Sequence, residues 1–152
     1  MRHLSILLFI ILCFNACKKS SNNLLITPAA LSGTWSLHTA TGITYTNGVR
    51  SNTSTTTFNN TNAGFSNLDL VIEFNNNLTG TYQQPGLMGF PFTYVISGNQ
   101  LTWNFDSNVP SSAVTGIPTN FTIKALTNNQ LELIYGGTSG NGIVYDDIYT
   151  KN

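Results

Sequence analysis

The chain has 152 residues, about the length of one domain, and a formal net charge of zero. Charged residues make up only 8% of it, and Asn, Thr, Ser and Gly take their place. The sequence has no basic patch beyond Lys18-Lys19, so nucleic acid is excluded as an expected partner. Enough patterned aliphatic and aromatic residues remain to form a packed core, which argues against a disordered chain.

The N-terminus has the layout of an export signal. A basic start is followed by an apolar run from Leu4 to Phe14 and then by the small residue Ala16. The run is about half as long as a membrane-spanning helix requires, so a removable signal over residues 1–16 is expected. Cys17 follows directly, and a polar stretch begins with Lys18-Lys19.

The junction between Ala16 and Cys17 resembles the lipobox of bacterial lipoproteins. Phe14 and Asn15 replace the usual Leu and small residue, as in the looser lipoboxes of the Bacteroidota. The resemblance implies that the Cys17 thiol carries a diacylglyceryl group, that the signal is cut before it and that the new amine is also acylated. Several acyl chains together hold a protein at a membrane essentially permanently. Residues 17–28 then form an acylated tether; the alternative is that Cys17 is incidental in a secreted or cytosolic protein.

The remainder, residues 29–152, is expected to be one all-β domain. A single helical turn is predicted at Pro28 in "TPAALS", before the first strand. Beyond it, short runs alternate between apolar and polar residues, as strands of an antiparallel sheet with one dry and one wet face do. The apolar positions of these runs are Leu68, Leu70, Ile72 and Phe74; Leu101, Trp103 and Phe105; Phe121, Ile123 and Ala125; Leu131, Leu133 and Tyr135; and Ile143, Tyr145 and Tyr149.

Turn residues between these runs predict an up-and-down meander. Gly98-Asn99 suits a tight hairpin because both residues accept positive φ, and Asn128-Asn129 serves a second hairpin less ideally. The spacing predicts eight to ten strands, which either close into a β-barrel or stack as a β-sandwich.

Two segments interrupt this rhythm. Residues 49–67 are rich in Ser, Thr and Asn and are interpreted as a long mobile loop, with a frayed strand near Thr55–Phe58. The stretch "QQPGLMGFPF" carries the apolar pair Leu87-Met88. Such a tip either covers a cavity, contacts a partner or packs on its own sheet.

A family resemblance starts at Gly33-Thr34-Trp35, which resembles the Gly-x-Trp motif of the lipocalins. The stretches "IEFNNNLTGTY", "FTYVISGNQLTW" and "FTIKALTNNQLELIY" are similar to those of small lipocalin-like lipoproteins of the Bacteroidota. The resemblance implies a lipocalin-like barrel over residues 31–150, with Trp35 packed across its closed end; in the sandwich alternative Trp35 is simply a core aromatic. The family's central Thr-Asp-Tyr motif is missing. So is its late Arg over the Trp, and Lys151 is the only late basic residue.

No catalytic constellation is assembled by the sequence, so the protein is not expected to be an enzyme or to need a cofactor or metal. His38 is the only histidine outside the signal, and alternation places it on the outer face. Cys13 would be lost with the signal, which leaves no disulfide and no catalytic thiol. Asp146 and Asp147 are expected to point to opposite faces, with Asp147 inside between Tyr145 and Tyr149. A buried carboxylate needs a hydrogen-bond donor, either a tyrosine hydroxyl or a polar ligand.

Two functions are compatible with these features. The first is a membrane-anchored lipocalin-like lipoprotein that binds a small apolar ligand in the barrel mouth; the second is a non-catalytic structural or accessory envelope protein with a filled barrel, whose loops bind a protein or glycan. The expected location is the bacterial outer membrane on the periplasmic side, because no acidic residue follows Cys17 closely; the cell surface is the alternative. The oligomeric state is left open. No ligand contact is assigned to Ile72, and the ligand-binding residues predicted are Trp35, Tyr94, Trp103, Leu87 and Met88.

Overall fold

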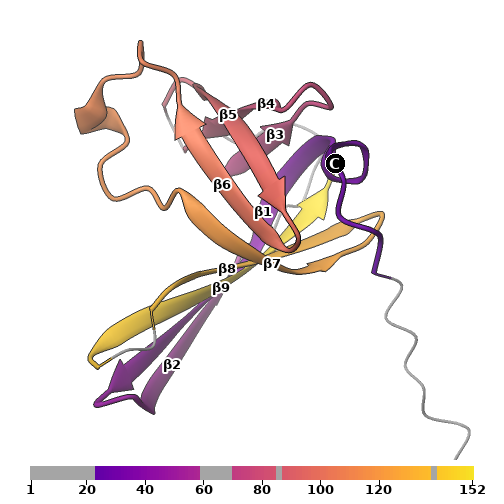
Figure 1. Ribbon diagram of the computed structural model, residues 1–152. Helices are drawn as coiled ribbons and strands as arrows, with labels where there is room; N and C mark the ends of the chain where they lie inside the picture. The colour runs from indigo at the N-terminus through magenta and orange to yellow at the C-terminus, as the bar shows by residue number, and fades with distance from the viewer. Residues whose placement is uncertain (1–22, 59–69, 85–86, 138–139) are drawn as a thin grey trace, which may run out of the picture.

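The computed structural model describes residues 23–58, 70–84, 87–137 and 140–152. These residues form a nine-stranded antiparallel sheet, preceded by the one-turn helix α2 (Pro28–Leu31) (Figure 1). A short 3₁₀ turn, η1 (Ser111–Ala113), lies between the sixth and seventh strands. The strands are β1 (Gly33–Thr46), β2 (Val49–Thr57), β3 (Val71–Phe74), β4 (Thr79–Gln83), β5 (Phe90–Ser97), β6 (Gln100–Phe105), β7 (Asn120–Leu126), β8 (Gln130–Gly136) and β9 (Gly142–Lys151).

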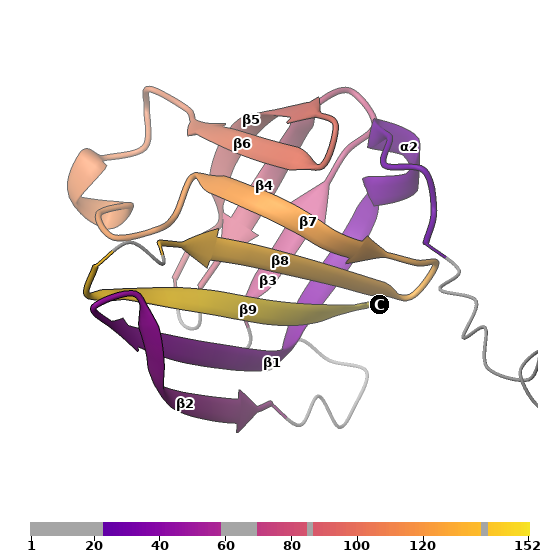
Figure 2. The same cartoon turned by 60° about the horizontal axis from the view of Figure 1, so that its bottom comes forward.

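The sheet closes into a barrel because the last strand returns to the first. β1 pairs with β9 along nearly its whole length, from Trp35 opposite Lys151 to Tyr45 opposite Gly142. Strands β3 to β9 follow one another as an up-and-down meander, so β1 and β3–β9 form an eight-stranded closed barrel (Figures 1 and 2). The predicted all-β meander and lipocalin-like barrel are confirmed, and the sandwich alternative is wrong.

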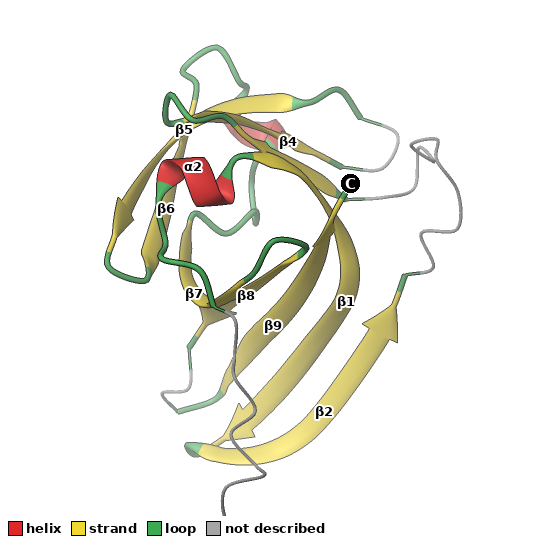
Figure 3. Cartoon of the chain, turned by 90° about the vertical axis from the view of Figure 1, so that its right-hand side faces the viewer, coloured by secondary structure: helices red, strands yellow, loops and turns green. Residues whose placement is uncertain are grey.

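The long strand β1 has two halves with different neighbours. Residues 33–36 pair with β3, whereas residues 39–46 pair with β2. A register shift between Leu37 and Thr39 separates the two halves on the β9 side. Beyond it, β1, β2 and β9 continue as a sheet that extends past the rest of the barrel, as the lower left of Figure 1 and the curved strands of Figure 3 show.

The segment 49–57 corrects one prediction from the sequence. It was expected to be mobile loop with at most a frayed strand at its end, but Val49–Thr57 is a continuous strand paired with β1. All nine residues of β2 are exposed, so no burial pattern distinguishes the strand in the sequence. Its β-branched threonines suit extended backbone, and cross-strand contacts such as Thr41 Oγ1 to Thr55 Oγ1 at 3.2 Å stabilise the pairing. The rest of the expected loop, residues 59–67, lies outside the described residues.

Both predicted hairpins and the predicted helical turn are confirmed. Gly98-Asn99 joins β5 to β6, and Gly98 has a φ of 60°. Asn128-Asn129 lies in the turn between β7 and β8, where the Thr127 hydroxyl accepts from the Gln130 amide at 3.0 Å. Helix α2 starts at Pro28, and its Thr27 N-cap accepts from the Ala30 amide at 3.1 Å. Within the described ranges, no helix is long and apolar enough to cross a membrane.

Candidate ligand site in the open half of the barrel

One half of the barrel interior is filled with side chains. Trp35, Ile72, Phe74 and Tyr94 are at most 1% exposed, and helix α2 adds the fully buried Leu31. The Trp35 indole donates to the Leu31 carbonyl at 2.7 Å, and the Tyr94 hydroxyl donates to the Asn75 carbonyl at 2.7 Å. We call this the closed half. It contains two of the predicted ligand residues, Trp35 and Tyr94, with their polar atoms bonded to backbone.

The other half becomes accessible step by step along β9. On the face of β9 opposite to Asp146, the side chains become more exposed from the end of the strand to its start. The exposed fraction is 3% for Tyr149, 4% for Asp147, 38% for Tyr145 and 44% for Ile143. Gly42 lies opposite Tyr145 on β1, and a Cβ added there would be 3.8 Å from the Tyr145 ring, so the ring rests on the glycine. We call this end, beyond Asp147, the open half.

Asp147 lies at the boundary between the two halves. Its Oδ2 accepts a hydrogen bond of 3.0 Å from the Tyr135 hydroxyl of β8, whereas its buried Oδ1 has no partner among the described residues. Burial raises the pKa of Asp147 to about 6, against the opposing effect of the Tyr135 hydrogen bond. Burial and the nearby Asp147 charge raise the pKa of both Tyr135 and Tyr149.

This arrangement confirms the predicted orientation of the adjacent carboxylates. Asp147 is buried, whereas Asp146 pairs with Lys124 at 2.7 Å on the outer face. Lys124 also pairs with Glu132 at 2.6 Å, and hydrogen bonds to the two carboxylates raise the Lys124 pKa. A tyrosine hydroxyl serves the inner carboxylate, as one of the two alternatives predicted.

Trp103 connects the closed half to the open half. Its ring stacks on Phe92 at 4.8 Å and contacts Phe121 at 4.3 Å and Tyr82 at 5.7 Å. The contacts continue through Phe121 to Tyr135 at 5.4 Å. The Trp103 Nε1 is buried without a hydrogen-bond partner among the described residues. Trp103 is therefore the predicted ligand residue with an uncommitted polar atom next to the open half.

Aromatic rings continue from Trp103 to the solvent. Tyr135 stacks on Tyr145 with a centroid distance of 5.0 Å and an interplanar angle of 17°. We call the rings of Trp103, Tyr82, Phe121, Tyr135 and Tyr145 the aromatic wall. Sequence reasoning placed Tyr135 on a dry face but assigned it no site role, and it did not select Tyr82. The available signal was the strand period of two, which puts Tyr135 on the same face as Leu133 and Tyr82 on the same face as Gly80.

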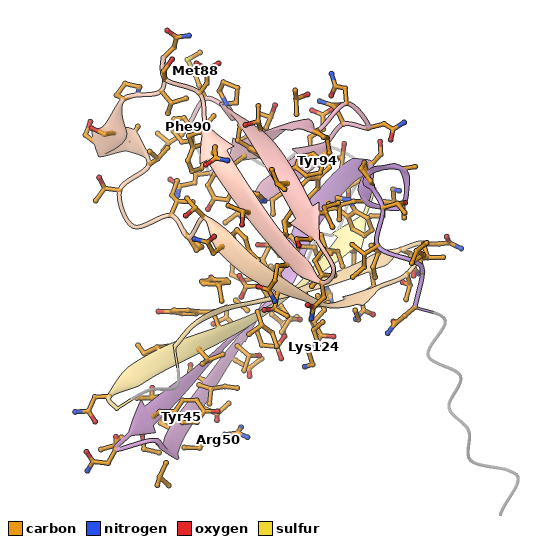
Figure 4. The ribbon with its side chains drawn as sticks, viewed as in Figure 1. Tyr45, Arg50, Met88, Phe90, Tyr94 and Lys124 are labelled. Carbon is orange, nitrogen blue, oxygen red and sulfur yellow. The ribbon has the colours of Figure 1, made fainter. Side chains whose placement is uncertain are left out.

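Leu87 and Met88 lie in the loop that joins β4 to β5. Both side chains are exposed, and neither belongs to the buried core. Figure 4 shows Met88 at one end of the molecule, away from Tyr94, while Tyr45 and Arg50 mark the tip of the β1–β2 extension. The contact of Leu87 and Met88 with a ligand stays a prediction.

Among the described residues, no group of three or more His, Cys, Asp or Glu could hold a metal ion.

Comparison with protein families and with curated proteins found no match. Among solved structures, the chain is similar to the crystal structure of a lipocalin-like protein from Bacteroides uniformis ATCC 8492. The TM-score is 0.51 and the identity 16%, and the alignment covers 81% of this chain and 99% of that one. At this identity the similarity concerns the fold. The chain has a lipocalin-like fold.

Proposed function

We propose that this protein is a lipid-anchored envelope protein that binds a small, mainly apolar ligand in the open half of its barrel. The observation that supports the ligand most directly is the aromatic wall, which runs from buried Trp103 to exposed Tyr145. Ligand sites are mostly apolar surfaces with a few polar groups that fix orientation. Here Trp103 Nε1 and Asp147 Oδ1 would be those groups, because neither has a partner among the described residues.

The anchoring part of the proposal depends on Cys17, which lies outside the described residues. Its support is the sequence pattern: an apolar run, a small residue, the cysteine and then a polar tether. The proposed location is the bacterial outer membrane, facing the periplasm. A lipocalin-like fold is generally non-enzymatic, and a non-catalytic role agrees with it.

The ligand can be tested by tryptophan emission. Long-chain fatty acids and neutral apolar compounds extracted from the envelope would be titrated into the full chain. Trp103 is part of the aromatic wall, whereas Trp35 is buried in the closed half. We therefore expect a saturable change in the wild type that disappears in Trp103→Phe, although Trp35 still emits. Leu87→Asp tests the predicted entrance and should weaken binding by wetting it.

A second function is favoured by a different observation. The closed half is packed with aromatic side chains, while Leu87 and Met88 are exposed on a loop. An accessory protein with a filled barrel would use such a loop to contact a protein or glycan. No emission change with any apolar compound, together with loss of a co-purifying partner in Met88→Asp, would favour this function over ligand binding.

A further inference from the structure

An apolar groove lies on the outside of the closed half, where the described chain begins. It encloses about 690 Å³ between the segment before α2 and the end of the β5–β6 hairpin. None of its ten lining residues is charged. Four of them are large apolar side chains that are exposed: Leu24 at 36%, Leu25 at 83%, Leu78 at 42% and Val95 at 57%. We call these four residues the leucine patch.

Leu78 is held in an unfavourable backbone conformation. Its φ is 65°, in the left-handed region that side chains other than Gly, Asn and Asp rarely adopt. The turn is fixed on both sides, because the Leu78 amide donates to the Asn75 carbonyl at 3.2 Å and the Leu78 carbonyl accepts from the Tyr94 amide at 2.9 Å. Three asparagines precede Leu78, yet the position that favours asparagine carries leucine. An exposed, strained apolar residue in a groove is a reason to look for an apolar occupant.

The position of the groove in the chain identifies this occupant. Leu24 and Leu25 are only seven and eight residues beyond Cys17. A fully extended chain covers roughly 3.3–3.6 Å per residue, so Leu24 lies within about 25 Å of an acylated Cys17 at most. Lys18-Lys19 lie within this stretch and suit anionic headgroups. The leucine patch is thus tied to the place where the acyl chains enter the bilayer.

We infer that the leucine patch rests on the lipid surface and fixes the orientation of the barrel on the membrane. The inference rests on the proposed anchoring. Exposed apolar side chains bury themselves at the boundary between headgroups and acyl chains, and the gain adds to the attachment through lipid. In this orientation the closed half faces the membrane. The β1–β2 extension, at the opposite side of the molecule in Figure 1, points away, and the open half faces the aqueous space.

The test uses the full chain, as isolated from a Gram-negative host, in nanodiscs of phosphatidylethanolamine and phosphatidylglycerol. Lipids spin-labelled near the headgroup broaden the amide signals of residues close to the surface. We expect several-fold stronger broadening for Leu24, Leu78 and Val95 than for the β1–β2 turn at Asn47-Gly48. Uniform broadening, or broadening centred on the β1–β2 turn, would overturn the inference.

Matched variants separate lipid contact from folding. Leu78→Asn should remove the backbone strain, and Val95→Thr keeps a β-branched residue in strand β5. The double variant should fold at least as stably as the wild type but lose the preferential broadening at residues 78 and 95, whereas the control Val49→Thr, at an exposed valine in β2, should retain it. Preferential broadening retained by the folded double variant would also contradict the inference.

The mass of the isolated protein distinguishes the two proposals. If Cys17 carries acyl chains but the broadening is uniform, the anchoring stands and the orientation is wrong. If Cys17 is unmodified but the leucine patch is still broadened, the lipid contact stands without the anchor. An unmodified Cys17 with no preferential broadening contradicts both.

Discussion

The Lys151 ammonium lies 5.1 Å above the centre of the Trp35 ring and donates a hydrogen bond of 2.6 Å to the Ser32 carbonyl. Because Trp35 and Lys151 are opposite each other in the β1–β9 ladder, the end of the last strand covers the start of the first. Lys151, the late basic residue of the sequence, therefore covers the Trp35 ring. This contact therefore joins the last strand to the first and also covers the closed half of the barrel.

Truncation of Lys151 should loosen this closure. Lys151→Ala loses a cation–π contact and a charge-assisted hydrogen bond, which together are worth about 1–3 kcal/mol of unfolding free energy. Lys151→Arg keeps the charge over the ring and should cost less than half as much. Urea unfolding followed by tryptophan emission measures both. Equal losses for the two variants would show that the contact is not what stabilises this end.

Replacement of Asp147 should change the pH dependence of stability. Its folded pKa, about 6, lies above the ordinary value of 3.8, so the folded state binds the proton more tightly. The favourable contribution is complete below about pH 3.8 and is lost as the pH rises through 6. In Asp147→Asn the side-chain oxygen still accepts from Tyr135, and the cost of a buried charge disappears. We expect the variant to be more stable at pH 7 by on the order of 2 kcal/mol.

The control for Asp147 is its outer neighbour. Asp146→Asn removes an ion pair with Lys124 instead of a buried charge. It should destabilise the protein slightly or not at all. Most of the slope between pH 4 and 6 should remain, because burial raises the Asp147 pKa more than the Asp146 charge does. Denaturant midpoints measured from pH 4 to 7 for both variants decide the matter. A wild-type stability that rises from pH 4 to 6 would contradict the assignment of a raised pKa to Asp147.

The barrel was predictable where side chains alternate between core and solvent. The runs at residues 101–105 and 131–135 became β6 and β8, because one face of each packs into the interior. In β7 the predicted alternation holds for Phe121 and Ile123, but a register shift after Ile123 places Leu126 in the core instead of the predicted Ala125. Gly98 marked its turn through the positive φ that the hairpin needs. Strand β2 was missed because it lacks this alternation between core and solvent. It buries neither face, so its pairing depends on the backbone of β1 and leaves no period in the sequence.

The site was predictable in part. Alternation correctly placed Asp147 inside and Tyr149 near it, since the Asp147 charge contributes to the raised pKa of Tyr149. Alternation gave no means to select Tyr135 as the hydrogen-bond donor. That choice depends on the register of β8 against β9, which sets Tyr135 opposite Tyr145 and within reach of the carboxylate. Lys151 shows the same limit. Only the β1–β9 register brings its ammonium over Trp35.

The exposed end of the aromatic wall gives a local test of ligand binding. Tyr145→Ala removes the ring that stacks on Tyr135 at the open half and should weaken binding of an apolar ligand about tenfold, the loss of roughly 1.4 kcal/mol of contact. Tyr45→Ala is the matched control, because Tyr45 belongs to the same extension but lies opposite Gly142 rather than Tyr135. Binding that falls equally in both variants would point to a general effect of the extension and not to the wall.

The anchoring proposal is tested at the two cysteines. In Cys17→Ser the acylated thiol is missing, so the protein should stay uncut or move from the membrane fraction to the soluble fraction. Cys13→Ser lies four residues earlier within the expected signal and should leave both cleavage and fractionation unchanged. The mass of the mature wild-type protein should equal that of a chain that starts at residue 17, plus the added acyl groups. A wild-type protein that is soluble, with an unmodified Cys17 by mass, would refute the anchor and the outer-membrane location together. Ligand binding by the barrel would then be judged on the emission titration alone.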